Sequence, residues 1–437
     1  MTEIINIFFI LFTFLALSAF PLNIYNQKFT HSIGVISIFD LVTLNLLLNI
    51  FALFVISFIV IDYSKIYISL LFFSISTNLF YFFSKKKYFK FFLNKEFIFF
   101  ILISFIIFSS IARSPILSWD GIENWFFKAQ FFFYNYNFFD LRESRGFNYY
   151  PHLGTFLWGF FWKNSILQYE YTGRLIYIYI FLLSIFSISD LLYKNNFIKL
   201  FFSFFTILLC FDNFLFSGYQ EVLLFSFLIF LSKYIYIYFL NEKRLILLVC
   251  FLILNLIPWI KNEGYLFVII FTLSLSLLIG HFKIKKDILI FILFSWTLLI
   301  VKNFIFYKFL SFNPAHMGSL IFSFNFFDIF NLVFLIIQGL VIAFFKYKIW
   351  LLIIGSFIFY RNYNFSTKQK FFIKFLKINL IFYLLLIFVI YFSVINDFRG
   401  LNWWIDNSLD RLLYGISGFF IIQIILVTKY YKNYNLK

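Results

Sequence analysis

The sequence has few charged residues for its length. Only 13% of its 437 residues are Asp, Glu, Lys or Arg, while 63% are hydrophobic. Globular domains contain about 25% charged residues and roughly half apolar residues. A soluble core could not bury this much apolar sequence, and no segment is polar enough for a separate soluble domain. The composition therefore excludes a soluble protein.

Cysteine is also scarce. The two cysteines, Cys210 and Cys250, each lie within an apolar run, which leaves no basis for a disulfide framework or a cysteine-rich zinc cluster. His152 has no obvious second ligand nearby in the sequence, so we predict no metal site. The sequence requires no cofactor, and the cofactor stays unknown, with a divalent metal as an open alternative.

Aromatic and basic residues are abundant instead. The chain has 78 Phe and 29 Tyr, which we interpret as lipid-facing filler in place of Leu and not as a cofactor-binding pattern. Its net charge is +17, but the basic residues form short clusters between the apolar runs. Such clusters are typical of cytoplasmic loops under the positive-inside rule. The pattern gives no support for binding to nucleic acid.

Apolar runs long enough to cross about 30 Å of hydrocarbon recur along the whole chain. We therefore predict an all-α, polytopic transmembrane helix bundle of about 11–13 spans, with residues 1–437 forming a single transmembrane domain. The expected spans are 4–21, 41–61, 66–83, 97–113, 172–192, 197–211, 221–240, 245–258, 265–280, 288–308, 328–345, 373–396 and 411–428. Residues 4–21 lack the basic stretch and clear cleavage site of a signal peptide. Segment 349–360 is apolar but short, so either it or 328–345 is expected not to span.

The lysine clusters predict the orientation of these spans. Placing the lysine-rich residues 84–96 inside puts residues 114–171 outside, and the later connections then alternate. The connections 193–196, 241–244, 281–287 and the tail 429–437 fall inside, while 212–220, 259–264, 309–327 and 397–410 fall outside. The polar and acidic residues discussed below then collect on the external side.

The one long connection is the external loop 114–171. It contains Trp119, Trp125, Trp158 and Trp162, and tryptophan is enriched at the membrane–water interface. We predict short interfacial helices over about residues 120–133 and 153–163, joined by a charged turn.

The strongest local motif begins this loop, at Ser118-Trp119-Asp120-Gly121-Ile122-Glu123-Asn124. In a helix, Asp120, Glu123, Asn124 and Lys128 would share one face, because residues three and four apart are neighbours. The alternative is that Asp120 serves only as a helix N-cap. Capping would explain Asp120 but not Lys128.

Further polar residues follow at the expected external ends of the spans. Arginines near a membrane surface can clamp phosphate with two hydrogen bonds, or can merely contact headgroups. The acidic residues and lysines at span ends are either solvated helix ends and local pairs or functional groups, since ionisable groups within membranes are costly. The residues concerned are Arg142, Arg145, Glu221, Lys261, Glu263, Asp410 and Arg411.

Five motifs occur in an order and at a spacing that resemble a known family. They are Trp119-Asp120 to Lys128, Tyr150-Pro151 to Trp158, Gly218-Tyr219-Gln220-Glu221, Lys261-Asn262-Glu263-Gly264 and Ser408-Leu409-Asp410-Arg411. Together they resemble the C-type, polyprenyl-phosphate-sugar-dependent integral membrane glycosyltransferases, particularly the bacterial branch similar to aminoarabinose and protein mannosyl transferases. The resemblance covers about residues 97–428, a glycosyltransferase-like core, and leaves 1–96 as extra N-terminal helices. The sequence departs from the family in these extra helices and in lacking a strict acidic dipeptide, because its second acidic residue is Glu123.

The resemblance implies an inverting glycosyltransferase that uses a sugar carried on polyprenyl phosphate. Asp120 would accept the acceptor's proton or orient the acceptor hydroxyl, with Glu123 as the second acidic position. The residues expected to bind the donor phosphate or the substrate are Lys128, Arg142, Arg145, Glu221, Lys261, Glu263 and Arg411. The acceptor would be a glycan, lipid or protein of the envelope, and the protein would lie in a bacterial inner or plasma membrane with its active site external.

Two other classes of protein remain as alternatives. A non-enzymatic lipid or polysaccharide transporter would carry ionisable groups along a path through the membrane midplane, whereas most charge in this sequence lies near the two faces. An envelope polymer ligase or polymerase would differ mainly in its acceptor.

Overall fold

The part of the chain that the structure describes contains helices and no strands. The computed structural model describes residues 2–22, 37–59, 61–84, 93–143, 150–192, 195–212, 217–282, 285–310, 326–360, 363, 365–393 and 400–434. The predicted all-α, polytopic fold class is therefore confirmed.

The helices coincide with the apolar runs expected from the sequence. In chain order they are α1 (Thr2–Ser18), α3 (Ile38–Ile56), α4 (Tyr63–Ser84), α6 (Lys95–Arg113), α7 (Phe127–Phe133), α8 (Leu153–Lys163), α9 (Glu170–Ser189), α10 (Asn196–Cys210), α11 (Glu221–Asn241), α12 (Arg244–Leu256), α13 (Asn262–Leu277), α14 (Lys285–Phe309), α15 (Phe326–Lys346), α16 (Lys348–Phe359), α17 (Thr367–Ser393), α18 (Leu401–Trp404) and α19 (Asp410–Tyr434). Several begin at a polar residue whose side chain accepts a hydrogen bond from a free backbone N–H. Asn94 caps α6 in this way, and Asn195 caps α10.

The described apolar helices fall into three groups, which are long helices, shorter helices and one bent pair. By length and composition, eight helices within the described residues are able to cross a membrane, and α1, α10, α12 and α13 are apolar but shorter. Helices α15 and α16 bend by 100° at their junction. The expected choice between 328–345 and 349–360 is thus replaced by a bent pair, which forms one broken span or a re-entrant loop.

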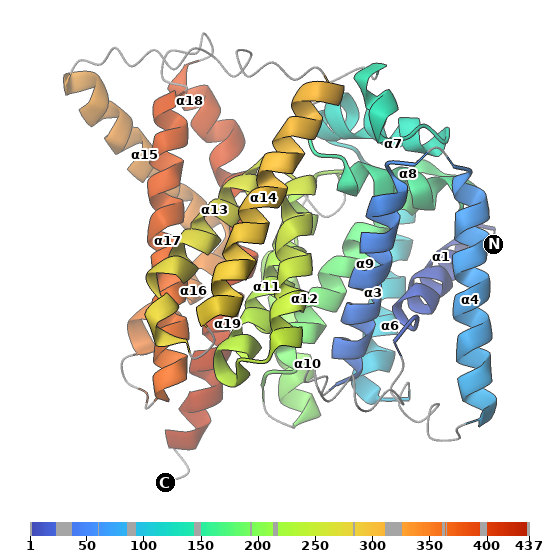
Figure 1. Ribbon diagram of the computed structural model, residues 1–437, viewed down its shortest axis with the longest axis horizontal. Coiled ribbons are helices and arrows are strands. Elements are labelled where there is room, and N and C mark those ends of the chain that lie inside the picture. The colour runs from blue at the N-terminus through green and yellow to red at the C-terminus, as the bar shows by residue number, and fades with distance from the viewer. Residues whose placement is uncertain are drawn as a thin grey trace.

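Helices α9 and α11 form the centre of the bundle (Figure 1). The apolar stretches of both are completely buried, and α11 packs along α19. Helices α4, α14 and α17 lie outside them, and only 11%, 28% and 33% of their apolar stretches are buried. Their exposed side chains are largely apolar, such as Phe83, which is 78% exposed, as expected for residues that face lipid.

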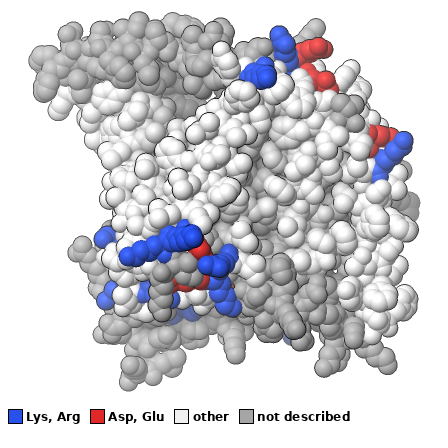
Figure 2. Space-filling view, viewed as in Figure 1, with Lys and Arg blue, Asp and Glu red and all other residues white. Residues whose placement is uncertain are grey.

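The charged side chains lie near the two ends of the bundle. On the face drawn in Figure 2 they gather near the upper edge, at the right edge of the upper half and in the lower left, and the described surface between these groups is uncharged. This distribution fits a protein whose middle zone contacts hydrocarbon.

The described parts of the loop, residues 114–143 and 150–171, cover one end of the bundle with short helices. A π-helical turn (Gly121–Phe126) continues into α7, a 3-10 helix (Phe138–Glu143) follows, and α8 packs against both α7 and α9. The two helices predicted at 120–133 and 153–163 are therefore present. We call this end of the bundle, at the top of Figure 1, the site face.

Helices α8 and α9 approach each other closely at Gly173. A Cβ atom there would overlap the Trp158 carbonyl oxygen and come within 2.7 Å of Trp158 Cδ1. We expect Gly173→Ala to destabilise the protein by about 1–3 kcal/mol, because a packed backbone cannot yield to an added methyl. Thermal unfolding in detergent measures this effect. Gly355→Ala is the control, since no atom lies within 4 Å of its added Cβ, and equal losses in both variants would contradict the prediction.

Candidate functional site

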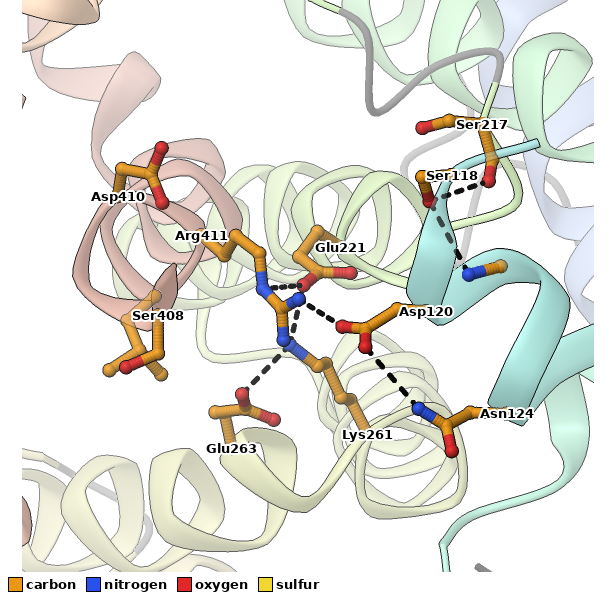
Figure 3. Close-up of polar contacts among 12 residues, drawn as sticks. Ser118, Asp120, Asn124, Ser217, Glu221, Lys261, Glu263, Ser408, Asp410 and Arg411 are labelled. Carbon is orange, nitrogen blue, oxygen red and sulfur yellow. Dashed lines mark hydrogen bonds and ion pairs between the residues drawn. The ribbon is translucent and has the colours of Figure 1, made fainter. Parts of the chain in front are cut away.

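Five charged side chains meet at the site face (Figure 3). They come from the loop before α7, the start of α11, the α12–α13 connection, the first turn of α13 and the start of α19. The members of this cluster, which we call the site network, are Asp120, Glu221, Lys261, Glu263 and Arg411. All five were among the residues expected from the sequence to bind substrate or catalyse. The structure brings them together, and their roles remain predictions.

Arg411 joins the loop to the helical core. Its guanidinium forms an ion pair with Asp120 through Nη1, and its Nε lies 3.1 Å from Glu221 Oε1. The same guanidinium lies over the Tyr219 ring, 5.1 Å from the centroid. Asp120 also accepts a 3.3 Å hydrogen bond from Asn124. One arginine thus holds two carboxylates and an aromatic ring in place.

Lys261 links Glu221 to the third carboxylate of the site network, Glu263. Its Nζ lies 2.7 Å from Glu221 Oε1 and 2.8 Å from Glu263 Oε1. Burial would lower the pKa of Lys261, but the two carboxylates more than offset it and raise the pKa above its ordinary value. Lys261 therefore stays protonated and can act as a fixed positive charge.

A break between α12 and α13 positions Lys261. Pro258 lies in a 3-10 turn over Ile257–Trp259, which ends α12, and Lys261 itself has extended backbone before α13 begins at Asn262. The Gly264 N–H donates to the Lys261 carbonyl at 3.0 Å, and a Cβ at Gly264 would overlap the Ile257 carbonyl oxygen. Proline and glycine thus permit the sharp turn that the sequence motif predicts.

Exposure separates the members of the site network into two groups. The side chains of Glu221 and Lys261 are 1% and 8% exposed, whereas those of Asp120, Glu263 and Arg411 are 17–22% exposed. Glu221 Oε2 has no hydrogen-bond partner among the described residues. Glu221 and Lys261 form the enclosed base of the site, and the other three members can meet a substrate.

Three of the residues predicted from the sequence lie outside the site network, and a fourth is not described by the structure. Glu123 is exposed at the surface, and Arg142 is exposed at the end of the 3-10 helix. Arg145 lies outside the described residues. Lys128 is buried, donates to the Tyr150 carbonyl at 2.8 Å and lies over the Trp125 and Tyr150 rings.

Lys128 and Glu123 do not join Asp120 in the site network, although the sequence places all three on one face of a regular α-helix. The intervening residues Gly121–Phe126 form a π-helical turn, which contains more residues per turn than the α-helix and so changes the register. Burial in these surroundings holds the pKa of Lys128 well below its ordinary value.

A second charged cluster was missed from the sequence. In the buried interior of the described bundle, toward the end opposite the site face, Lys233 Nζ lies 2.5 Å from Asp40 Oδ1 and donates to the Ser187 carbonyl at 2.6 Å. Next to it, Asp190 pairs with Lys199 at 3.1 Å. The sequence contains one sign of this second cluster, which is that Lys233 lies within the apolar run 221–240. An ionisable residue inside a span indicates a functional or structural pair.

Lys302 was also missed, inside the expected span 288–308. It is 4% exposed and lies over the rings of Trp259, Tyr265 and Phe306, at 5.1–5.8 Å from their centroids.

His152 packs against Trp259 and hydrogen bonds to Ser57 Oγ at 2.9 Å. Burial, together with the nearby lysines, holds the pKa of His152 well below its ordinary value, so its imidazole is neutral.

Within the described residues, no group of three or more His, Cys, Asp or Glu side chains is arranged to hold a metal ion. No known protein family, curated protein or solved structure matches the chain.

Proposed function

We propose that this protein is a membrane glycosyltransferase that moves a sugar from a polyprenyl-phosphate donor to an envelope acceptor on the external face. The observation that carries the proposal is the site network. It places a partly exposed carboxylate, Asp120, against the cation Arg411, above the enclosed pair of Glu221 and Lys261. A reaction of this kind needs a base and a cation for the departing phosphate, side by side.

In the proposed reaction, the acceptor hydroxyl oxygen attacks the anomeric carbon of the donor sugar. The hydroxyl proton passes to Asp120 as the new bond forms, and the bond from the anomeric carbon to the phosphate oxygen breaks. Polyprenyl phosphate departs with the bonding electrons. Arg411 and Lys261 stabilise the charge that develops on the phosphate, and preorganised charges of this kind contribute strongly to catalysis.

The ion pairs of the site network support an order in which the donor binds before Asp120 meets the acceptor. Arg411 is already occupied by Asp120 and Glu221, so the donor phosphate competes with Asp120 for this guanidinium. Phosphate binding frees the Asp120 carboxylate to face the acceptor hydroxyl. Glu221, which is enclosed, keeps Arg411 and Lys261 in position throughout the exchange.

The position of the remaining charges favours an enzyme over a transporter. Lys233 pairs with Asp40 near the start of α3, and its neighbour Asp190 caps the end of α9. This second cluster lies toward the end of the bundle opposite the site face, and its described members are satisfied by one another. A transport path would need ionisable groups near the midplane.

A direct assay tests the proposal with the purified full-length protein in lipid vesicles. We expect it to release free polyprenyl phosphate from one of a panel of polyprenyl-phosphate hexoses when acceptor lipids or glycans are present. Movement of the intact donor between leaflets without release of polyprenyl phosphate would support the transporter and contradict the proposal.

We expect residues near the site face to be external. Tyr63 at the start of α4 donates to the Tyr136 carbonyl at 2.8 Å, so the 114–171 loop and Ser84 lie at opposite ends of this helix. Single cysteines at Glu143 and Ser84 are probed with an impermeant maleimide in intact cells. Labelling is expected only at 143, and labelling only at 84 would reverse the proposed orientation. The native cysteines, Cys210 and Cys250, are buried and should not react with the maleimide.

A further inference from the structure

A basic pocket lies at the end of the bundle opposite the site face. It has a volume of about 520 Å³ and is lined by Lys370, Lys374 and Lys377 of α17, together with Tyr360, Tyr363 and Phe365. Helix α11 begins in the site network at Glu221 and ends beside α17, where Lys368 donates to the Leu240 carbonyl at 2.7 Å. The 21 residues of α11 rise about 30 Å, which is the thickness of the hydrocarbon core. The pocket therefore lies at the level of the lipid headgroups of the other leaflet.

The lysines in this pocket lack acidic partners. Among the described residues, none of Lys370, Lys374 and Lys377 forms an ion pair, whereas the neighbouring Lys368 pairs with Glu242 at 3.3 Å. Lys377 instead lies 4.1 Å from the centroid of the Tyr360 ring. No carboxylate is among the described residues that line the pocket. The described residues around the three lysines therefore leave their positive charges without neutralisation.

The three lysines lie in the first half of α17, where their positive charges are electrostatically unfavourable without a bound anion. The first turn of α17 contains no acidic residue, although the positive end of the helix dipole favours negative charge there. Lysines four and three residues apart, such as Lys370 with Lys374 and Lys374 with Lys377, also repel each other. A bound anion would offset both effects.

An apolar groove continues from the pocket toward the membrane interior. It has a volume of about 220 Å³ between α16 and α17, shares Lys377 with the pocket and is otherwise lined by Ile354, Phe357, Ile358, Leu380 and Ile381. A basic pocket joined to an apolar groove matches a molecule with an anionic head and a hydrocarbon chain. We propose that this site binds an anionic membrane phospholipid, with its phosphate among the three lysines and one acyl chain in the groove. The proposal does not depend on the glycosyltransferase reaction.

Native mass spectrometry of the purified full-length protein tests this site, with phosphatidylglycerol, phosphatidylcholine and inorganic phosphate as probes. We expect the protein to retain phosphatidylglycerol in preference to phosphatidylcholine. Lys370→Gln with Lys374→Gln should weaken that binding about 25-fold, because each lysine near an anionic lipid contributes roughly fivefold. Equal binding of the two lipids, or unchanged binding by this double variant, would overturn the proposal.

Two further variants separate a lipid site from simple surface charge. Lys285→Gln with Lys286→Gln removes two exposed lysines from the start of α14, at the same end of the bundle, and should leave phosphatidylglycerol binding unchanged. Ile381→Trp fills the groove and should weaken binding of the lipid while leaving the lysines intact. Equal loss in the Lys285/Lys286 variant would indicate general charge attraction. Full lipid binding by the Ile381→Trp variant, or competition by millimolar inorganic phosphate, would indicate a site for free phosphate instead.

Discussion

Asp120→Asn is expected to abolish sugar transfer while leaving the protein folded. An amide oxygen can still accept hydrogen bonds from Arg411 and Asn124, which both contact Asp120, but an amide cannot take the acceptor's proton. Loss of a general base costs about 10²–10⁴-fold in rate, so turnover should fall by at least about 10²-fold. Release of polyprenyl phosphate in vesicles measures the rate.

The affinity of the Asp120→Asn variant for the donor gives a second measurement that separates a catalytic role from a structural one. In the proposed reaction the donor phosphate competes with Asp120 for Arg411, so neutralising Asp120 should leave donor binding unchanged or tighten it. Asp140→Asn is the matched control, since Asp140 lies in the same loop and its side chain accepts from the Asn137 N–H at 2.7 Å, which Asn can also do. Full turnover in folded Asp120→Asn, or weaker donor binding with normal turnover, would show that Asp120 is structural.

Lys233→Met is expected to produce the largest loss of stability. The side chains of Lys233 and Asp40 are only 1% and 5% exposed, so the substitution removes the positive charge that faces a buried carboxylate. Removing one member of a buried ion pair costs about 3–5 kcal/mol. Unfolding of the purified protein in mixed micelles measures the free energy of unfolding.

The double variant shows whether the pairing itself is responsible. Adding Asp40→Leu to Lys233→Met removes both charges, and replacement of a whole buried pair by apolar residues is often neutral. We therefore expect most of the lost stability to return. Lys368→Met is the control at an exposed pair, where the Lys368 side chain is 45% exposed, and it should cost less than about 1 kcal/mol. A double variant as unstable as Lys233→Met alone would show that Lys233 acts through packing.

The site network could be predicted in part. Each member of the site network lies near the end of an apolar run, where a charged residue is noticeable in the sequence. These members are Asp120, Glu221, Lys261, Glu263 and Arg411. Their common location on one side followed from counting spans. Their pairing did not, because Asp120 and Arg411 are 291 residues apart. Lys128 was assigned to the same group by counting along a regular α-helix, but its ammonium group is buried and donates to the Tyr150 carbonyl instead.

The sequence by itself determined the class of protein and the helices. Hydropathy is a local property, so each apolar run had to become a helix to satisfy its backbone hydrogen bonds in lipid, and the caps and breaks are short-range as well. Only the tertiary structure decided which charges meet. Burying Lys233 or Lys261 is tolerable only opposite a carboxylate, and Asp40 and Glu221 reach them from other helices. No local pattern contains such a pairing, because it depends on how α3, α11, α13 and α19 pack against one another.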